Sequence, residues 1–444
     1  MTSLPASDRF LRLSTICLAL LSILVWIGPF MDWAFGVHTA LGRINNLSMI
    51  VAGLYFFLVL AIPVSMRSRK ERQVLGATAA LFLYATLITL DRYADWFVSF
   101  GGLLALFGSI SAGFGAYILG KSGKGIHTRI TIAMLITLPA LAIPPAMIAY
   151  DPDAFKAFWL NVYGYSNVRV FGYFAAVTTA LLAGLTMGRR TSVSAKIFCL
   201  HFAALAFSWS MLFWSGSRAG MVAAVFAFLI SLAVAGRKPY APFLFTGTAG
   251  IVGALMSTLY FTPGRWFGLF ERVKVTTQQI SKGGVTEASS NRVDMWQWAM
   301  GKIMEEPFLG HGYLPMAGMQ DEGFDYFHTH NIVIEYLLSF GLIAGTAMLL
   351  LTIFLWGRAL LAARRIGEPV AMALMMMIVL LPIYAMFSAT LFFPFHLMIF
   401  MAGMGSLIGW DVWNRRPPEP EEAPFKARAD WMFDDLDAAT IRTS

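Results

Sequence analysis

Charged residues are scarce in this chain of 444 residues. They make up 13% of the sequence, hydrophobic residues make up 58%, and the mean hydropathy is +0.66. Soluble domains carry about 25% charged residues. The shortage of charge therefore excludes a soluble globular domain and indicates a polytopic membrane protein.

Cysteine is almost absent as well. The two cysteines, Cys17 and Cys199, fall within or at the edge of apolar runs, where a free thiol behaves as a small hydrophobic side chain. The sequence therefore indicates no disulfide framework. It also has no phosphate-cradling P-loop and no repeat of solenoid period.

Apolar runs, by contrast, are abundant, and many have the ~20 residues that cross a bilayer. By length alone they predict an all-α fold with roughly twelve transmembrane helices. The first run follows a polar leader without a small-residue cleavage site, so we expect an uncleaved span and no signal peptide. The expected spans cover residues 14–34, 47–64, 74–90, 97–119, 130–149, 170–187, 197–214, 221–235, 241–261, 332–356, 370–386 and 395–410.

Basic residues are distributed unevenly over the connections between these spans. They follow the even-numbered spans, in residues 67–72, 121–129, 189–196, 237–238 and 358–365. Because short loops rich in Lys and Arg stay in the cytoplasm, we expect both termini to be cytoplasmic. The net charge of +8 is then mostly a signal of orientation and gives no reason to expect nucleic-acid binding.

Two segments stand outside the expected spans. Residues 262–331 form a long, partly helical loop between spans nine and ten, on the side opposite the termini. Residues 414–444 begin with a run of Pro, Arg and Glu, a composition that cannot bury a core. We therefore expect a membrane domain at residues 1–413 and a disordered cytoplasmic tail.

A helix is predicted inside the long loop from Asn291-Arg292 onward. Asn291 can cap it, and Pro307 ends it. Its expected apolar stripe consists of Val293, Trp296, Met300 and Ile303. Such a helix would lie flat against the membrane domain and direct Arg292 toward the spans.

Three arginines stand at helix starts on the loop side: Arg169, Arg218 and Arg292. An arginine at a helix N-terminus is unfavourably placed for the helix dipole, and a guanidinium fork matches phosphate oxygens. Both points indicate an anion site. Structural alternatives remain, because Arg169 and Arg218 can extend to the membrane interface and Arg292 can pair with Asp294 or Glu287.

His330 stands at the start of span ten, where an imidazole of ordinary pKa can accept a proton near neutral pH. Glu335 lies five residues further on, within the first turns of the same span. An acidic side chain there is energetically costly unless it has a partner. An alternative is a metal pair of His328 and His330, completed by Asp325 or His311. The loop contains no H-E-x-x-H motif and no cysteine pair that would support such a metal site.

At these residues the chain resembles the O-antigen ligase and O-antigen polymerase superfamily. Its members are bacterial inner-membrane glycosyltransferases that use glycans linked to undecaprenyl pyrophosphate. The ligase pattern has Gly, Thr or Tyr three positions after the last motif glycine, whereas this chain has Ala344 there and Gly345 one step later, so polymerase stays open. The resemblance rests on Ser217-Arg218-Ala219-Gly220, on Arg292-x-x-x-Trp296 followed by Pro307-Phe308-Leu309-Gly310-His311-Gly312, and on His330-Asn331 with nine residues to Gly341.

The resemblance implies a metal-independent, inverting glycosyltransferase without cofactor, acting from a periplasmic loop. Arg218 and Arg292 would hold the pyrophosphate, Arg169 would assist, and His330 would be the general base. The donor would be an undecaprenyl-pyrophosphate glycan, and the acceptor a lipid A core for a ligase or a growing glycan for a polymerase. The competing classes are a lipid-linked sugar flippase or transporter and a scaffold of a polysaccharide export machine. Few ionisable residues lie mid-span, which disfavours a transporter.

Overall fold

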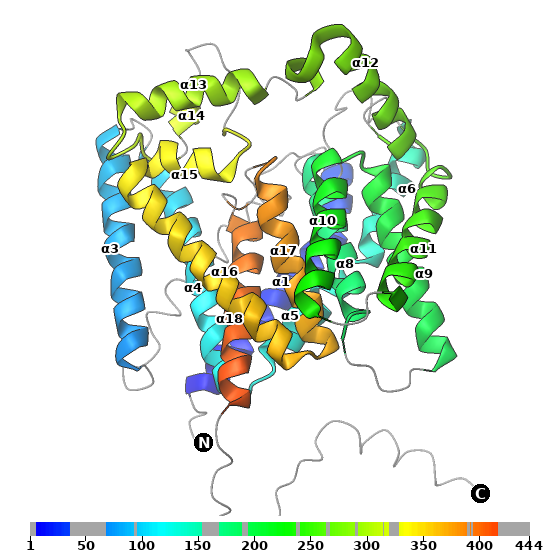
Figure 1. Cartoon of the computed structure of the whole chain (residues 1–444), viewed down its shortest axis with the longest axis horizontal. Coiled ribbons are helices and arrows are strands. Elements are labelled where there is room, and N and C mark those ends of the chain that lie inside the picture. Colours follow the sequence, from blue (N-terminus) through cyan, green and yellow to red (C-terminus); the bar gives the residue numbers. More distant parts are fainter. Residues whose placement is uncertain are drawn as a thin grey trace, which may run out of the picture.

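Every regular element that the structure describes is a helix. The computed structural model describes residues 6–35, 68–92, 96–152, 168–188, 194–236, 240–262, 267–288, 292–313, 315–318, 328–388, 391 and 394–415. Figure 1 shows the helices in their chain order. They are α1 (Ala6–Phe35), α3 (Arg69–Arg92), α4 (Trp96–Lys121), α5 (Ile126–Ile136), η2 (Pro139–Ala142), α6 (Ile143–Tyr150), α8 (Val168–Leu185), α9 (Ala195–Trp214), α10 (Arg218–Ala235), α11 (Tyr240–Ser257), α12 (Leu269–Ala288), α13 (Arg292–Glu305), α14 (Pro315–Gly318), α15 (Ile332–Phe340), η4 (Gly341–Gly345), α16 (Thr346–Ile366), α17 (Pro369–Ala385) and α18 (Pro394–Asn414).

Eight helical segments of the described residues are long and apolar enough to cross a membrane. An all-helical membrane protein, as the composition predicted, is thereby confirmed. The expected spans coincide with helices, except for residues 47–64, which lie outside the described part of the chain. The total of twelve spans stays a prediction. The disordered tail expected at residues 414–444 stays a prediction too, because the described residues end at Arg415.

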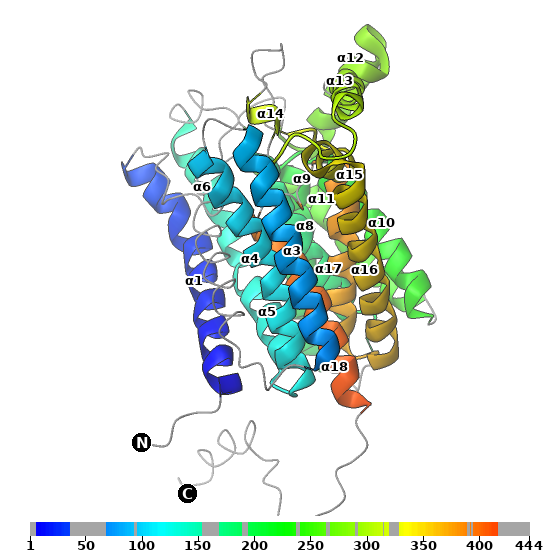
Figure 2. The ribbon, with the colours of Figure 1, turned by 90° about the vertical axis from the view of Figure 1, so that its left-hand side faces the viewer.

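Two helices, α8 and α17, lie at the centre of the bundle. Nearly all of their side chains are buried, and both are apolar around the whole circumference. Such helices must be covered on every side, and α5, α9, α10, α16 and α18 pack around them (Figures 1 and 2). α18 also packs closely on α4, because a Cβ at Gly405 or Gly409 would overlap with the backbone of α4.

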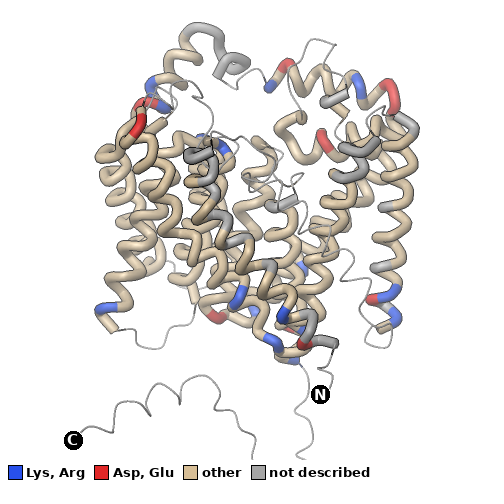
Figure 3. Tube along the Cα trace, turned by 180° about the vertical axis from the view of Figure 1, so that it is seen from behind, with Lys and Arg blue, Asp and Glu red and all other residues tan. Residues whose placement is uncertain are grey.

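The ends of α1, α3 and α4 meet at one end of the bundle. Lys124, just after α4, pairs with Asp8 in the first turn of α1 at 2.6 Å, and Lys121 at the end of α4 pairs with Glu71 at the start of α3. Figure 3 shows charged residues near both ends of the bundle and a middle zone almost without them. A charge-free middle zone is what a bilayer core requires.

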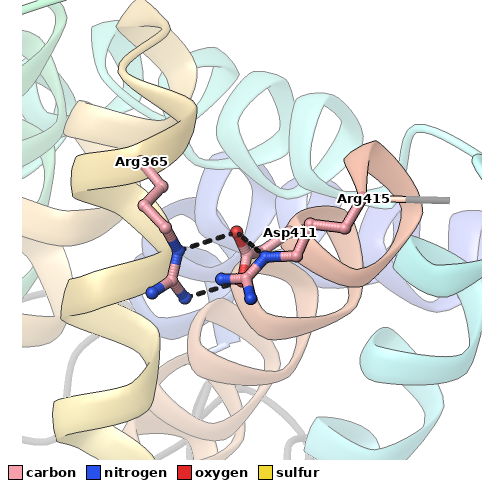
Figure 4. A network of polar contacts seen from close by, with 3 residues as sticks. All are labelled: Arg365, Asp411 and Arg415. Atoms are coloured by element: carbon pink, nitrogen blue, oxygen red, sulfur yellow. Dashed lines mark hydrogen bonds and ion pairs between the residues drawn. The ribbon is translucent and has the colours of Figure 1, made fainter. Parts of the chain in front are cut away.

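A clamp around Asp411 joins α16 and α18 at that same end (Figure 4). Arg365 donates to its two carboxylate oxygens at 3.0 and 2.7 Å, and Arg415 does so at 3.2 and 2.7 Å. Helices α12, α13 and α14 lie at the opposite end (Figure 1). The described part of the loop is thus on the side away from the start of α1 and the end of α18. Which side is periplasmic stays a prediction.

Helix α13 crosses the top of the bundle, roughly perpendicular to the spans (Figure 1). Met295, Ala299 and Ile303 are its buried residues, and they cluster with Leu338 of α15. The stripe predicted from the sequence is confirmed at Ile303, which is 2% exposed, and is wrong at Met300, which is 47% exposed. The small side chain of Ala299 allows α13 to approach α15, which turns Met300 away from the contact.

Candidate active site

His330 lies in the turn that leads into α15. Asn331 caps that helix, because its Oδ1 accepts hydrogen bonds from the N–H groups of Val333 and Ile334 at 3.0 and 3.3 Å. His330 has a φ of 56°, and among the described residues it is the only one other than glycine with a positive φ. A left-handed conformation costs about 1–2 kcal/mol, and strain of this kind concentrates at functional sites. The histidine is also buried, with 7% of its surface exposed.

A buried carboxylate fixes the turn before His330. Glu335 is fully buried, and its Oε2 accepts the backbone N–H of Thr329 at 2.6 Å and the Thr329 hydroxyl at 2.8 Å. The indole N–H of Trp296, on α13, donates to the carbonyl of Thr329 at 2.8 Å. Thr329 is thus the partner that Glu335 requires at this depth, and α13 and α15 together hold the backbone next to His330.

His328 and His330 form a pair of neutral imidazoles. Their ring centroids are 4.1 Å apart, and the backbone N–H of His330 donates to Nδ1 of His328 at 3.2 Å. Burial lowers the pKa of His330 well below 6.5, and His328, Arg169 and Arg292 lower it further. Burial and the same two arginines lower the pKa of His328 to about 3. The ordinary pKa expected for His330 was therefore wrong, because burial and the nearby cations all oppose protonation.

The three arginines singled out in the sequence meet a fourth, Arg272 of α12. Burial lowers the pKa of Arg272 to about 10, and Arg218, Arg169 and Arg292 all contribute to the shift through like-charge repulsion. Arg169 is exposed, whereas the other three are partly buried. The four guanidinium groups thus form one cationic cluster, and His330 lies within reach of its field. Such a cluster is complementary to a polyanion.

Two reciprocal hydrogen bonds place α12 against the start of α10. Nε of Arg272 donates to the carbonyl of Gly216 at 3.2 Å, and Nη1 of Arg218 donates to the hydroxyl of Thr276 at 3.3 Å. Each helix therefore offers an arginine to the other. Guanidinium groups held in this way are ordered before any ligand arrives, which lowers the entropic cost of binding.

Tyr384 of the central helix α17 links the starts of α8 and α10. Its hydroxyl donates to the carbonyl of Arg169 at 3.0 Å and lies 3.0 Å from Oγ of Ser217, the N-cap of α10. Gly172 permits this arrangement, because a Cβ there would approach Cβ of Ser217 to 2.5 Å. The two helix starts that carry Arg169 and Arg218 are thus held side by side.

The alternative metal site does not assemble among the described residues. His311 Nε2–H donates to the carbonyl of Lys302 at 2.8 Å, which ties His311 to the end of α13. In the described part of the chain no three His, Cys, Asp or Glu side chains gather as a metal site would require. Asp325 lies outside that part. That the reaction needs no metal stays a prediction.

The sequence did not predict a role for Arg272, because the buried side of α12 combines polar and apolar residues. Val275 is buried there beside the half-buried Arg272, Thr276 and Gln279, whereas Phe270 and Ile280 are 61% and 56% exposed. A search for an apolar stripe facing a core does not find such a helix. The polar residues at helical spacing, with apolar residues between them, are the signal that could have revealed it.

Residues 203–350 match a family model described as O-antigen ligase. This segment belongs to the O-antigen ligase family. It covers about a third of the chain and includes Arg218, Arg272, Arg292 and His330, whereas Arg169 precedes it. The resemblance to the ligase and polymerase superfamily is thereby confirmed. No curated protein matches the chain.

The match of residues 203–350 to this family indicates the activity at a general level. It indicates an enzyme of the glycosyltransferase kind, which transfers a glycan in the manner of a ligase or polymerase. The substrates at that level are a lipid-linked glycan and an acceptor.

Proposed function

We propose that this protein transfers a glycan from undecaprenyl pyrophosphate to an acceptor sugar hydroxyl on the periplasmic face of the bacterial inner membrane. The lipid A core is the acceptor in this proposal. The observation that carries it is the cluster of Arg169, Arg218, Arg272 and Arg292 beside the buried, strained His330. The cluster lies at one end of a membrane-crossing bundle, where a lipid-linked donor presents its diphosphate.

The reaction needs one proton acceptor and one stabilised leaving group. His330 removes the proton from the acceptor hydroxyl, and the oxygen attacks the anomeric carbon from the side opposite the diphosphate. The bond between that carbon and the diphosphate oxygen breaks, and the electron pair leaves with the lipid diphosphate. Inversion at the anomeric carbon follows. Arg218 and Arg292, assisted by Arg169, stabilise the negative charge that grows on the leaving oxygen.

Bound diphosphate also makes His330 a better base. In the free protein burial lowers the pKa of His330 most, and His328, Arg169 and Arg292 lower it further. A diphosphate among the arginines offsets their charge, and an anion near an imidazole favours its protonated form. The base therefore strengthens when the donor is in place, so the arginines act on both the leaving group and the proton transfer. With four guanidinium groups available, no metal ion is required.

A repeat-unit polymerase of the same superfamily is the second candidate. One observation favours it, since Ala344 occupies a place where the ligase pattern has Gly, Thr or Tyr. A lipid-linked sugar flippase, from another class, would use the same diphosphate lipid but form no glycosidic bond.

The test is a transfer assay with purified full-length protein. It supplies a lipid-linked glycan donor with either a lipid A core or a second lipid-linked unit as acceptor, in the presence of EDTA. We expect transfer to the core. Arg218→Lys and Arg292→Lys should each lower the rate by about a hundredfold, because a point charge cannot replace a bidentate fork on the diphosphate.

Arg358→Lys is the matched control, because Arg358 is exposed at the far end of α16. It should leave the rate unchanged. Full activity in both of the other variants would overturn the phosphate role. Growth of the lipid-linked glycan without transfer to the core would make the protein a polymerase, and activity that requires one divalent ion would refute the metal-free scheme.

A further inference from the structure

The three residues before α15 lie in a turn whose N–H groups are bound by side chains. N–H groups at the start of a helix have no acceptor within the helix, and a buried N–H needs one. Each N–H of this turn has an acceptor of its own: Oε2 of Glu335 for Thr329 at 2.6 Å, Nδ1 of His328 for His330 at 3.2 Å, and Oγ1 of Thr329 for Asn331 at 3.4 Å. The conformation of the turn therefore depends on these side chains.

The contact between His328 and His330 has the connectivity of an Asx turn. In such a turn the side-chain oxygen of Asn or Asp accepts the N–H of the residue two positions on. Nδ1 of an imidazole is bonded to Cγ, as Oδ1 of asparagine is, so the two acceptors lie the same number of bonds from the backbone. Nδ1 of His328 thus carries no proton, and the hydrogen of the neutral ring is on Nε2.

Two side chains hold the peptide group between Thr329 and His330 from opposite ends. Its carbonyl accepts the indole N–H of Trp296 at 2.8 Å, and its N–H donates to His328 at 3.2 Å. The orientation of this peptide plane determines the φ of His330, which is 56°. Residues other than glycine avoid this region, so the two hydrogen bonds oppose a return to an ordinary conformation.

A neutral acceptor suits this position better than a carboxylate would. Arg169 and Arg292 lie close enough to His328 to act on its pKa, which burial first and then these two arginines lower to about 3. His328 is therefore uncharged near neutral pH, and Nδ1 stays available as an acceptor. A carboxylate at the same place would pair with the two arginines and compete with an anionic ligand for them.

We propose that His328 is a positioning residue for His330. Together with Trp296 it fixes the peptide plane before His330 and so directs the imidazole of His330 toward the acceptor hydroxyl. The proposal rests on the proposed function, in which His330 is the general base. His328 acts through the backbone of His330 and makes no contact with substrate in this scheme.

The test compares His328→Asn with His328→Leu in the transfer assay on purified full-length protein. The two replacement side chains have nearly the same shape, but only asparagine has an acceptor at the place of Nδ1. His328→Leu should lower kcat by at least about thirtyfold, because a displaced base loses its alignment, while KM for the donor stays within about twofold. His328→Asn should keep at least about a third of kcat, because it restores the turn.

His328→Asp separates the acceptor from its charge. Its carboxylate can accept the same N–H, so kcat should be close to that of His328→Asn. KM for the donor should rise by at least about fivefold, because the added carboxylate pairs with arginines that hold the diphosphate. A role in stability alone would not divide the two kinetic constants between the Leu and Asp variants.

A measurement on the unmodified protein covers the case in which a variant does not fold. In protein labelled with ¹⁵N-histidine, the shifts of His328 should be those of an unprotonated Nδ1 and a protonated Nε2 at pH 7. His328→Asn, in which the His328 signals are missing, assigns them. A proton on Nδ1 of His328 would overturn the proposal, since that nitrogen could not then accept the N–H of His330.

The outcomes also separate this inference from the proposed function. If His328→Leu has the same kcat as His328→Asn while His330→Ala is inactive, the positioning role is wrong and the base assignment stands. Transfer by His330→Ala at the rate of the unmodified protein would mean that His330 is not the base, and the positioning role would be wrong with it.

Discussion

The imidazole of His330 is held neutral by its surroundings. Its pKa lies below 6.5 because of burial first and then because of His328, Arg169 and Arg292. A neutral imidazole is the form that a general base needs, but a depressed pKa also makes it a weak proton acceptor. The diphosphate of the donor offsets the part of this shift that comes from the arginines, and burial still favours the neutral imidazole.

This arrangement predicts two different acid limbs in the pH profile. As pH falls through 6.5, His330 in the free protein stays unprotonated, so kcat/KM should remain level there and decline only at lower pH. In the donor complex the diphosphate raises the pKa of His330, so kcat should decline at a higher pH than kcat/KM. Steady-state transfer rates between about pH 4 and pH 8 check this.

His311→Gln is the control, because the imidazole of His311 donates to the Lys302 carbonyl and a glutamine amide can donate instead. Both limbs should stay in place in that variant, whereas His330→Ala should abolish transfer. A kcat/KM limb at or above pH 6.5, the ordinary histidine value, would contradict the assignment of His330 as the base.

The sequence identifies site residues at helix starts. It does not identify residues whose role depends on contacts with partners far away in the sequence. Arg218, Arg292 and His330 could be singled out because each stands at a helix start. Tyr384 could not, since it lies in an apolar span 167 positions from its partner Ser217. Arg272 was not singled out either, since it lies within a helix that buries polar and apolar side chains on the same side.

At the scale of elements, two motifs far apart in the sequence form one structural unit. The turn after α13 pairs with the end of α15 through three backbone hydrogen bonds: Leu342 to Pro307 at 2.7 Å, His311 to Leu338 at 2.9 Å and Gly312 to Ser339 at 2.9 Å. Gly341 has a φ of 69°, and a Cβ there would overlap with the carbonyl of Phe308. This unit holds α13, and with it Arg292 and Trp296, over the turn that carries His330.

The π-turn that follows offers a physical reason for the departure from the ligase pattern. Residues Gly341–Gly345 form η4, a π-helical turn, and such a turn accommodates one extra residue. A Cβ at Gly345 would lie 2.6 Å from the carbonyl of Tyr336. The close contact with Tyr336 therefore lies at Gly345, one position after Ala344. The small residue is thus needed one position later than in the ligase pattern.

Gly341→Ala should therefore destabilise the protein and inactivate it. The positive φ and the overlap with Phe308 should together cost about 1–3 kcal/mol, and the displaced turn should move α13 away from His330. Gly301→Ala is the matched control, because Gly301 lies inside α13 with open space around its Cα. Alanine there should stabilise the helix by about 0.5–1 kcal/mol.

Thermal unfolding in detergent and the transfer assay measure both effects. We expect a lower midpoint and little transfer for Gly341→Ala, and an equal or higher midpoint with full transfer for Gly301→Ala. Equal stability and activity in the two variants would mean that the backbone contact between the two motifs is unimportant.

For the whole molecule, the sequence predicts the class of fold well and its details less well. Apolar runs show where the helices lie, because the bilayer requires a minimum length. They do not show breaks, such as η2 at Pro139–Ala142, which divides one expected span. Nor do they show that the helix beginning at Ile332 continues to Ile366, since its last turns contain Arg364 and Arg365.

The orientation in the membrane is a prediction that belongs to the molecule as a whole. The start of α1 and the end of α18 share one end with several basic residues, and α12 and α13 lie at the other end (Figures 1 and 3). Because basic loops are retained in the cytoplasm, α12 should be exposed to the periplasm. Single-cysteine variants test this, in a background with Cys17 and Cys199 replaced by alanine.

Gln278→Cys places a thiol on the exposed face of α12, and Lys196→Cys places one at the exposed start of α9. A membrane-impermeant maleimide added to spheroplasts should label Gln278→Cys and leave Lys196→Cys unlabelled until the membrane is permeabilised. Labelling of Lys196→Cys alone in intact spheroplasts would invert the orientation. It would also place the arginine cluster in the cytoplasm, where an acceptor assembled on the periplasmic face could not reach His330.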